Sequence, residues 1–132
     1  MYAVELDDSR TVRVSRGKHE ATYAVDGSLM NPLEAFYATL AGCAAVFAQK
    51  ACKELGVPAR GIRISCRPFA GAGGPLSLSR FKTEVTFPDT FPREMKGRVL
   101  EAIGHCAVKR IVEDGASVTF AVSEATASVV TA

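Results

Sequence analysis

The first quarter of the chain alternates apolar and polar side chains, which is the pattern of β-strands that bury one face. Three such runs occupy residues 2–6, 12–14 and 21–25. Residues that favour tight turns follow at 16–17 and again at 26–27. The pattern therefore predicts three short strands joined by tight turns.

A long helix is predicted next, because both of its ends carry recognisable signals. Asn31 offers an N-cap side chain, Pro32 suits the first helical position, and Glu34 lies three residues after the cap. Gly56 is the matching stop signal, and Pro58 follows it. The helix between these signals has about 24 residues and is about 36 Å long. A helix of that length crosses the whole molecule.

The middle of this helix is apolar on every side. Small residues fill the positions between its larger apolar side chains, which are Phe36, Tyr37, Leu40, Val46 and Phe47. A helix on the surface of a monomer would show a polar stripe, so this one has to be covered on nearly all sides. One small sheet covers one side only. We therefore infer that a second subunit covers another, and we expect an obligate homodimer.

The second half of the chain continues with strands and helices in mixed order. Strands are predicted over 61–67 and 80–87, with a flexible hairpin loop at 71–75 between them. A helix begins at Pro92, with a stripe made of Met95, Val99, Ile103 and Cys106, and a short helix covers 107–113. Strands at 117–122 and 126–131 end the chain. We expect one α+β domain spanning residues 1–132.

Composition and charge narrow the classes of function. The 132 residues are 48% apolar, and 16 basic against 14 acidic side chains leave a net charge of +2. No clustered basic face is present, so nucleic acid is not an expected partner. The longest uncharged apolar stretch, 35–49, is too short for a membrane span. No secretory signal is recognisable either, so we expect a cytoplasmic protein with reduced thiols and no membrane association.

Four cysteines are the candidate chemistry, and their spacing excludes some uses. The gaps between Cys43, Cys52, Cys66 and Cys106 are 9, 14 and 40 residues, so no zinc-binding or C-x-x-C redox motif occurs. We expect no metal and no cofactor. Cys52 lies half a turn away from Cys43 around the helix, and Cys66 shares the inward face of a strand, so both favour packing roles.

Cys43 and Cys106 leave two interpretations open. Cys43 is flanked by Gly42 and Ala44, small neighbours that leave room for a substrate, but a buried cysteine often acts only as a small apolar side chain. Cys106 follows His105 at a helix start, where backbone N–H groups favour a thiolate, yet it too could simply pack. No suitably placed Asn or Asp supports a cysteine hydrolase.

Two segments resemble a known family. The run from Asn31 to Cys43, NPLEAFYATLAGC, and the later run from His105 to Arg110, HCAVKR, are similar to those of the OsmC/Ohr thiol peroxidases. The order of predicted elements is similar over the whole chain. The resemblance implies antiparallel sheets wrapped around long central helices in a swapped homodimer.

The same resemblance implies an activity, the reduction of organic hydroperoxides by a dithiol. Cys43 corresponds to the reactive cysteine and Cys106 to the resolving one. An arginine from the N-terminal strands activates the thiolate in this family, and Arg16 is our candidate, with Lys18 in reserve. We expect the apolar substrate to be bound by Phe36, Tyr37, Leu40 and Phe47.

Two positions depart from the family pattern. Leu33 replaces a glutamate that holds the arginine, and Ala107 replaces a proline after the resolving cysteine. Glu34 points in another direction around the helix, and we interpret it as part of a capping box. The departures indicate a divergent branch with weak activity or a different substrate. The alternative function is a dimeric binding protein for an apolar small ligand, without peroxidase activity.

Overall fold

Two separate antiparallel hairpins are attached to one long helix in the structure, a computed structural model that describes residues 1–123. The elements in chain order are β1 (Thr11–Arg16), β2 (His19–Ala24), α1 (Pro32–Leu55), β3 (Arg63–Gly71), β4 (Gly74–Thr86), the 3-10 turn η1 (Arg93–Met95), α2 (Lys96–Ile103) and α3 (Ala107–Asp114). This mixture of helices and antiparallel sheets is the predicted α+β class.

Helix α1 has the bounds that the sequence predicts. The side-chain oxygen of Asn31 accepts a hydrogen bond from the N–H of Glu34 at 2.8 Å, and the N–H of Asn31 donates to the Glu34 carboxylate at 3.2 Å. Gly56 ends the helix in the left-handed region at φ 70°, a conformation that glycine adopts without steric cost. The reciprocal hydrogen bonds confirm the capping box and occupy the carboxylate of Glu34.

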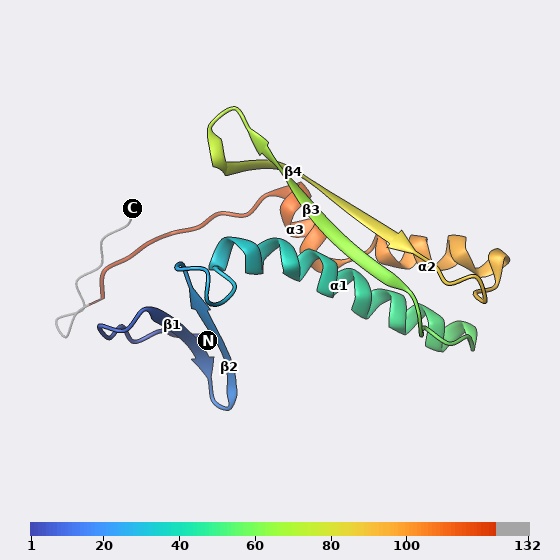
Figure 1. Cartoon of the computed structure of the whole chain (residues 1–132), viewed down its shortest axis with the longest axis horizontal. Helices are drawn as coiled ribbons and strands as arrows, with labels where there is room; N and C mark the ends of the chain where they lie inside the picture. The colour runs from blue at the N-terminus through green and yellow to red at the C-terminus, as the bar shows by residue number, and fades with distance from the viewer. Residues whose placement is uncertain (124–132) are drawn as a thin grey trace.

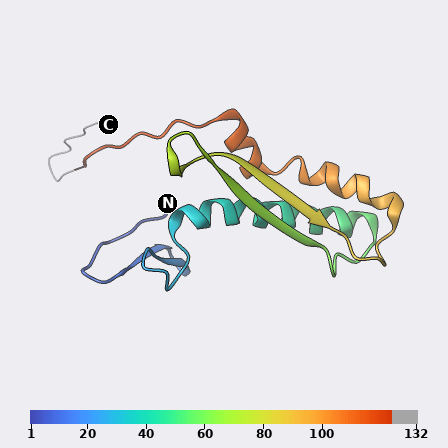
Figure 2. The same ribbon diagram turned by 45° about the horizontal axis from the view of Figure 1, so that its top comes forward.

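The β3–β4 hairpin lies along α1 (Figures 1 and 2). Its register pairs Cys66 with Thr83. Exposed and partly buried residues alternate along β3, as predicted. Strand β4 begins at Gly74, earlier than the predicted start at residue 80, because the ladder continues to a Gly71–Gly74 pair. The predicted flexible loop at 71–75 is therefore a tight hairpin turn.

The core lies between α1, the β3–β4 hairpin and α2. Its buried members are Ala48, Ala51, Cys52, Phe91 and Val99. Met95 and Ile103 pack against this cluster together with Val99, as the predicted apolar stripe requires. The helix itself is shorter than predicted, because α2 covers only Lys96–Ile103, so Met95 lies in η1 and Cys106 caps α3. Phe91 also packs its ring against Phe87, with the centroids 4.8 Å apart. The core thus fixes α2 beside the C-terminal half of α1.

The N-terminal strands form a smaller sheet than the sequence predicts. Strands β1 and β2 pair from Thr11–Ala24 to Arg16–His19. The first predicted strand, 2–6, makes only one bridge, between Ala3 and Ser15, with N–H···O distances of 3.1 and 3.0 Å. Among residues 1–123, most of its backbone therefore has no ladder partner, and the side chains of 2–6 are exposed.

The predicted strand at 117–122 is not formed. This segment runs away from α3 as an extended chain (Figure 1). Its large apolar side chains are exposed, and Phe120 is 67% exposed. A strand needs a neighbour for its backbone hydrogen bonds, and none lies beside this segment in the described part of the chain. The other predicted strand, 126–131, lies outside the described residues.

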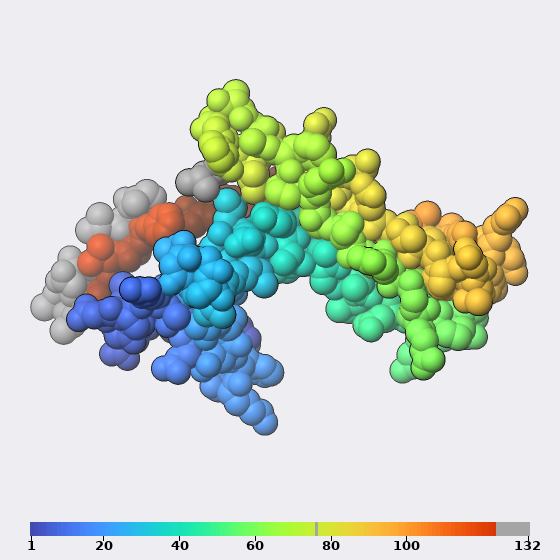
Figure 3. All heavy atoms as spheres, viewed as in Figure 1, coloured from blue at the N-terminus to red at the C-terminus, as the bar shows by residue number. Residues whose placement is uncertain are grey.

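A single chain exposes far more surface than a compact protein of its size. The accessible surface is 10309 Å², whereas a compact monomer of 132 residues exposes roughly 6700 Å². The space-filling view shows why, because the β1–β2 hairpin projects from the body of the molecule (Figure 3). Within residues 1–123, no helix combines the length and apolarity needed to span a membrane.

Candidate active site at Cys43 and Cys106

The candidate site lies where α3 packs against the middle of α1. Cys43 is in the fourth turn of α1 and is partly exposed, whereas Cys106 is the N-cap residue of α3 and is 2% exposed. The N–H of Cys106 donates to the carbonyl of Ile103 at 3.0 Å, and its carbonyl accepts from the N–H of Arg110 at 3.1 Å. The turn between α2 and α3 therefore holds Cys106 against α1.

The structure brings the two cysteines together as hydrogen-bond partners. Burial raises the pKa of Cys43, but hydrogen bonds from the Cys106 thiol and from the N–H groups of Val108 and Ala107 lower it by more. The resulting pKa of Cys43 lies below its ordinary value. Hydrogen bonds from the first turn of a helix favour a thiolate because they point partial positive charge at it.

Cys106 responds in the opposite direction. Its pKa is raised by burial first, and then by the hydrogen bond to Cys43 and by the charge of that neighbour. Backbone N–H groups of Lys109 and Val108 act against this rise without cancelling it. Cys43 therefore ionises first, and Cys106 remains protonated and donates to it.

The lowered pKa of Cys43 and the raised pKa of Cys106 are the reverse of what the position of Cys106 at a helix start favours. The helix start at Cys106 was expected to favour a thiolate at that residue. The N–H groups of α3 instead stabilise the sulfur of Cys43, which reaches them from α1. Sequence reasoning missed the N–H groups of Ala107 and Val108 as functional groups. The available signal was the predicted helix start itself, but only the packing of α3 on α1 shows which sulfur lies in front of it.

Cys52 and Cys66 do not join this pair. Cys52 is 1% exposed in the core, and burial raises its pKa. Cys66 is partly buried on the face of β3 that includes Ile62 and Ile64. Both positions agree with the packing roles that the sequence favours. A metal is not supported either, since the described residues contain no cluster of three His, Cys, Asp or Glu side chains.

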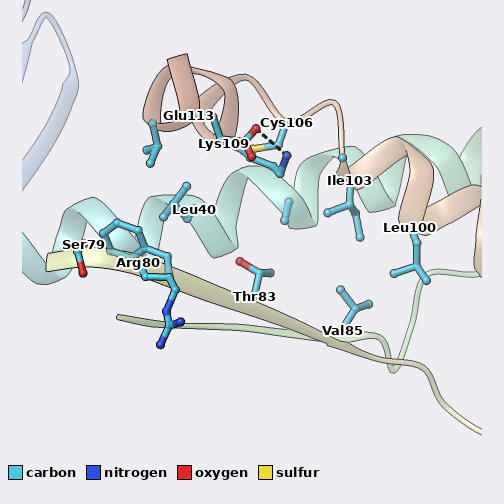
Figure 4. A pocket seen from close by; sticks show the side chains of 14 residues that line it. Leu40, Ser79, Arg80, Thr83, Val85, Leu100, Ile103, Cys106, Lys109 and Glu113 are labelled. Carbon is cyan, nitrogen blue, oxygen red and sulfur yellow. Dashed lines mark hydrogen bonds and ion pairs between the residues drawn. The ribbon is translucent and has the colours of Figure 1, made fainter. Parts of the chain in front are cut away.

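Two cavities adjoin the cysteine pair. The first, the Cys106 cavity, has a volume of about 550 Å³ and lies between β4, α1, α2 and α3. Figure 4 shows Leu40, Thr83, Val85, Leu100 and Ile103 around it, with the sulfur of Cys106 at one end. Lys109 and Glu113 form an ion pair of 2.8 Å at its edge.

The second, the Cys43 cavity, has a volume of about 650 Å³ and lies between β2 and the N-terminal half of α1. Tyr23, Met30, Thr39 and Val46 are among its larger lining residues, with Cys43 in the wall. Among residues 1–123, those that line this cavity include no charged side chain. Sequence reasoning missed Tyr23 and Met30, which come close to Cys43 only because β2 folds back onto α1.

Arg16 is not near Cys43 within one chain. It is the last residue of β1, pairs with His19 across the hairpin, and is exposed. Lys18 lies in the same turn, which points away from α1 (Figure 1). Neither residue lines the Cys43 cavity or the Cys106 cavity. Any role for Arg16 at this site requires that it come from a second copy of the chain.

The four residues expected to bind substrate do not form one surface. Phe36 is 45% exposed, and its ring lies 5.9 Å from that of Phe81. Tyr37 also packs against Phe81, with the ring centroids 6.5 Å apart. Leu40 lines the Cys106 cavity. Phe47 lines neither cavity. Phe36 and Tyr37 thus share the neighbour Phe81, which lines the Cys106 cavity together with Leu40, whereas Phe47 does not line that cavity.

Comparison with known proteins identifies the family and the fold of the chain. A family model described as OsmC-like protein matches residues 25–121. Two solved structures are similar, each with a TM-score of 0.70. One is a Psychrobacter arcticus 273-4 protein described as an osmotic stress induced and detoxification response protein, 13% identical, with 83% of this chain and 85% of that chain covered. The other is an OsmC like protein from Mycoplasma pneumoniae, 10% identical, with 86% of each chain covered.

A comparison with curated proteins found no match. The two structural similarities, at such low identity, concern the fold. The family match extends over most of the chain and includes α1, the β3–β4 hairpin, α2 and α3, and therefore both Cys43 and Cys106. The chain belongs to the OsmC-like family.

Proposed function

We propose that this protein is a thiol-dependent peroxidase that reduces organic hydroperoxides. The observation that carries the proposal is the contact between Cys43 and Cys106 in front of the first turn of α3, with the pKa of Cys43 lowered and that of Cys106 raised. A thiolate is the form that attacks peroxides, so this arrangement supplies a nucleophile and a second thiol beside it.

The reaction proceeds in two steps. The Cys43 thiolate attacks the outer oxygen of the hydroperoxide, the O–O bond breaks, and the alkoxide leaves and takes up a proton to become an alcohol. Cys43 is then a sulfenic acid. Cys106, as its thiolate, attacks the sulfur of Cys43, and hydroxide leaves and is protonated to water. The product is a Cys43–Cys106 disulfide, which an external dithiol reduces.

The hydroperoxide reaches Cys43 through the Cys43 cavity. The apolar and uncharged lining of that cavity suits an alkyl chain better than hydrogen peroxide. The N–H groups of Ala107 and Val108 stabilise the thiolate before attack. The detoxification role in the description of the Psychrobacter protein is consistent with removal of peroxides, and the reducing cytoplasm would supply the dithiol.

A homodimer completes the site in this proposal. The face of α1 that includes Gly42 and Val46 is exposed, and Val46 is 60% exposed. A second copy that covers this face would bury apolar surface from both chains. It would also bring its own N-terminal hairpin to the site, and Arg16 of that copy is our candidate for the cation that stabilises the leaving alkoxide.

Mass spectrometry after one equivalent of cumene hydroperoxide tests the proposal. We expect a Cys43–Cys106 disulfide in the wild-type protein. Cys43→Ser should consume no peroxide, and Cys106→Ser should stop at an oxidised Cys43 without the disulfide. Cys66→Ser is the matched control, because Cys66 lies away from the pair, and it should behave as wild type.

The competing function is a dimeric binding protein for an apolar ligand, which the two apolar cavities favour. Lipid that co-purifies with the protein, together with four unreacted thiols after peroxide treatment, would support it. Equal peroxide consumption by Cys43→Ser and wild type would overturn the peroxidase proposal.

A further inference from the structure

The outer face of the β3–β4 hairpin, which points away from α1, carries a cluster of basic side chains that the proposed reaction does not use. Arg63 and Arg67 of β3 and Arg80 and Lys82 of β4 are exposed there, and we call these four cations the basic face. The register pairs Arg67 directly with Lys82, and Phe69 directly with Arg80. Arg67 and Arg80 are 13 residues apart in the chain, so only strand pairing brings them together.

The basic face concentrates the positive charge of the chain. Four cations against one carboxylate, Glu84, give this side of the hairpin a net charge of +3, whereas the whole chain carries +2. Glu84 lies 3.6 Å from both Arg67 and Lys82, and one carboxylate neutralises only one of them. Arg67 is 66% exposed and Lys82 is 58% exposed, so no described element covers them. The remainder of the chain is slightly acidic.

The pairing of Arg67 with Lys82 is unfavourable for the fold by itself. Like charges directly opposite each other on a sheet repel and destabilise the pair. Arg80 adds a third cation, whose guanidinium carbon lies 4.7 Å from the centroid of the Phe69 ring, and Arg67 lies 5.6 Å from the same centroid. Figure 4 shows the Arg80 guanidinium on the far side of β4 from Leu40. A negatively charged partner against this face would relieve the repulsion.

The turn end of the same hairpin has a different character. Residues 70–79, which we call the tip, carry no charged side chain. Ala72, Gly73 and Pro75 are exposed around the turn. The tip projects from the body of the molecule (Figures 1 and 3). The register shifts after Phe69, and a bulge of this kind bends the strand. An uncharged, projecting tip therefore lies next to the basic face.

We propose that this hairpin docks on the surface of a bilayer that contains anionic phospholipids, with the tip in the headgroup region and the basic face against the lipid phosphates. Binding of this kind combines burial of apolar surface with attraction to anionic lipid. It needs no spanning segment, and the expectation of no membrane association rested on the lack of such a segment. The proposal concerns binding and not the chemistry of Cys43, so it does not depend on the proposed function.

The dimensions of the hairpin fit this arrangement. Phe69 and Gly71 are two residues apart on β3, which corresponds to about 7 Å along a strand. Interfacial elements are buried ~5–10 Å into the boundary between headgroups and acyl chains. A tip at that depth places Arg67, Arg80 and Lys82 at the level of the lipid phosphates. The backbone groups of the turn keep the tip out of the hydrocarbon core, because they would lose water there without gaining partners.

A nucleic acid fits the same surface less well. A single strand binds along a groove of cations with open aromatic rings on which its bases stack. Here the guanidinium of Arg80 occupies the ring of Phe69, and the tip beyond it offers no cation to a phosphate chain. An uncharged tip gains from a lipid interface and gains nothing from a chain of phosphates. A lipid surface is therefore the occupant that accounts for both parts of the hairpin.

Co-sedimentation with vesicles tests the electrostatic part of the proposal. The wild-type protein should bind vesicles of phosphatidylcholine with one quarter phosphatidylglycerol, and it should not bind phosphatidylcholine alone. Arg80→Gln should weaken binding roughly fivefold, and the double variant Arg67→Gln/Arg80→Gln roughly 25-fold, because each cation near an anionic surface contributes a similar amount. Arg80→Lys keeps the charge and should bind nearly as well as the wild type. Arg98→Gln is the matched control, because it removes the same charge from the exposed side of α2.

A single tryptophan tests the position of the tip. The chain contains no tryptophan, so Ala72→Trp places the only one at the turn, and Thr86→Trp places it at the other end of β4. The emission of Ala72→Trp should shift to shorter wavelength on anionic vesicles and should be quenched by lipids brominated near the headgroup. Thr86→Trp should show neither change. Binding by the wild type, which lacks the ring, establishes that the ring does not cause the association.

Four results would overturn the inference. They are a wild-type protein that does not bind anionic vesicles, equal loss of binding in Arg80→Gln and Arg98→Gln, equal emission shifts in Ala72→Trp and Thr86→Trp, and displacement from vesicles by millimolar inorganic phosphate at constant ionic strength. The last result would indicate a site for a free anion. Binding of oligothymidylate or polyglutamate that equals vesicle binding at physiological salt, and that is lost in the double variant, would assign the basic face to another polyanion and would also overturn the lipid proposal.

Discussion

At the residue scale, the lowered pKa of Cys43 depends on hydrogen bonds that reach it from another element. The Cys106 thiol and two backbone N–H groups of α3 stabilise its thiolate more than burial destabilises it. No cation of the same chain is among the causes of the lowered pKa in the described residues. Within the described residues, hydrogen bonding alone therefore offsets the effect of burial on the pKa of Cys43.

The lowered pKa of Cys43 predicts the pH dependence of its alkylation. Because the thiolate reacts with iodoacetamide, the rate should remain high below the ordinary thiol pKa of about 8.5 and fall only as the pH drops through the lowered value. Cys106→Ala removes a donor to the thiolate, so the midpoint should move to higher pH. The measurement is alkylation of the Cys43 peptide across a pH series.

Cys106→Ser serves as the control, since its hydroxyl still donates and the midpoint should rise less. A midpoint that stays constant or moves to lower pH in Cys106→Ala would contradict the role given to the Cys106 thiol.

At the scale of elements, the site depends on where α3 begins. Cys106 has φ −53° and ψ 126°, so the chain enters α3 from an extended conformation and Ala107 is the first helical residue. The N–H of such a residue has no partner within its own helix and is available to the sulfur of Cys43. Ala107 thus supplies a backbone donor that a proline at this position would lack.

Ala107→Pro tests this donor without damaging the helix. Proline suits the first helical position, and the extended backbone of Cys106 is compatible with a following proline. We expect the pKa of Cys43 to rise and its alkylation at neutral pH to slow several-fold, while the urea midpoint stays the same or increases. Ala107→Ser keeps the N–H and is the matched control. Equal alkylation rates in the two variants would show that this N–H is dispensable.

At the scale of the whole molecule, the large accessible surface of one chain indicates that the folding unit contains more than one chain. Its accessible surface of 10309 Å² exceeds that of a compact monomer by roughly 3600 Å². The excess lies partly on apolar groups in three places, namely residues 1–6, the Val46 face of α1 and the segment 117–122. A second copy that covers these surfaces would give the unpaired strands backbone partners.

Val46→Glu tests whether a second copy of the chain covers the exposed Val46 face of α1. A carboxylate buried in an apolar interface without a partner is strongly unfavourable, so we expect the dimer to dissociate and the urea midpoint to fall. Val46→Thr has nearly the same volume and no charge, so it should remain dimeric at the same protein concentration. Sedimentation equilibrium distinguishes the two states. A wild-type protein that sediments as a monomer, or a dimeric Val46→Glu variant, would contradict the proposed interface.

The site could be predicted from the sequence only in part. The bounds of α1 and the start of α3 follow from local signals, because capping and stop residues act within one turn of a helix. The pairing of Cys43 with Cys106 was expected only from the resemblance to a known family. The expected substrate surface and the role of Arg16 depend on which elements face each other. Phe36 and Tyr37 both meet Phe81, which lines one cavity with Leu40, whereas Phe47 does not line it. Helical spacing alone does not reveal these neighbours.

The resemblance to the OsmC/Ohr family, and not the pattern of residues, implied that Cys43 and Cys106 form a pair. The sequence pattern by itself determined the α+β class and the long capped helix, and it favoured packing roles for Cys52 and Cys66. These properties depend on periodicity and on residues close together in the chain. Only the tertiary structure decided which cysteine has the lowered pKa, because the N–H groups that lower it lie more than sixty residues away from Cys43. It also decided that each sulfur opens to its own cavity, since both cavities form between elements that are distant in sequence.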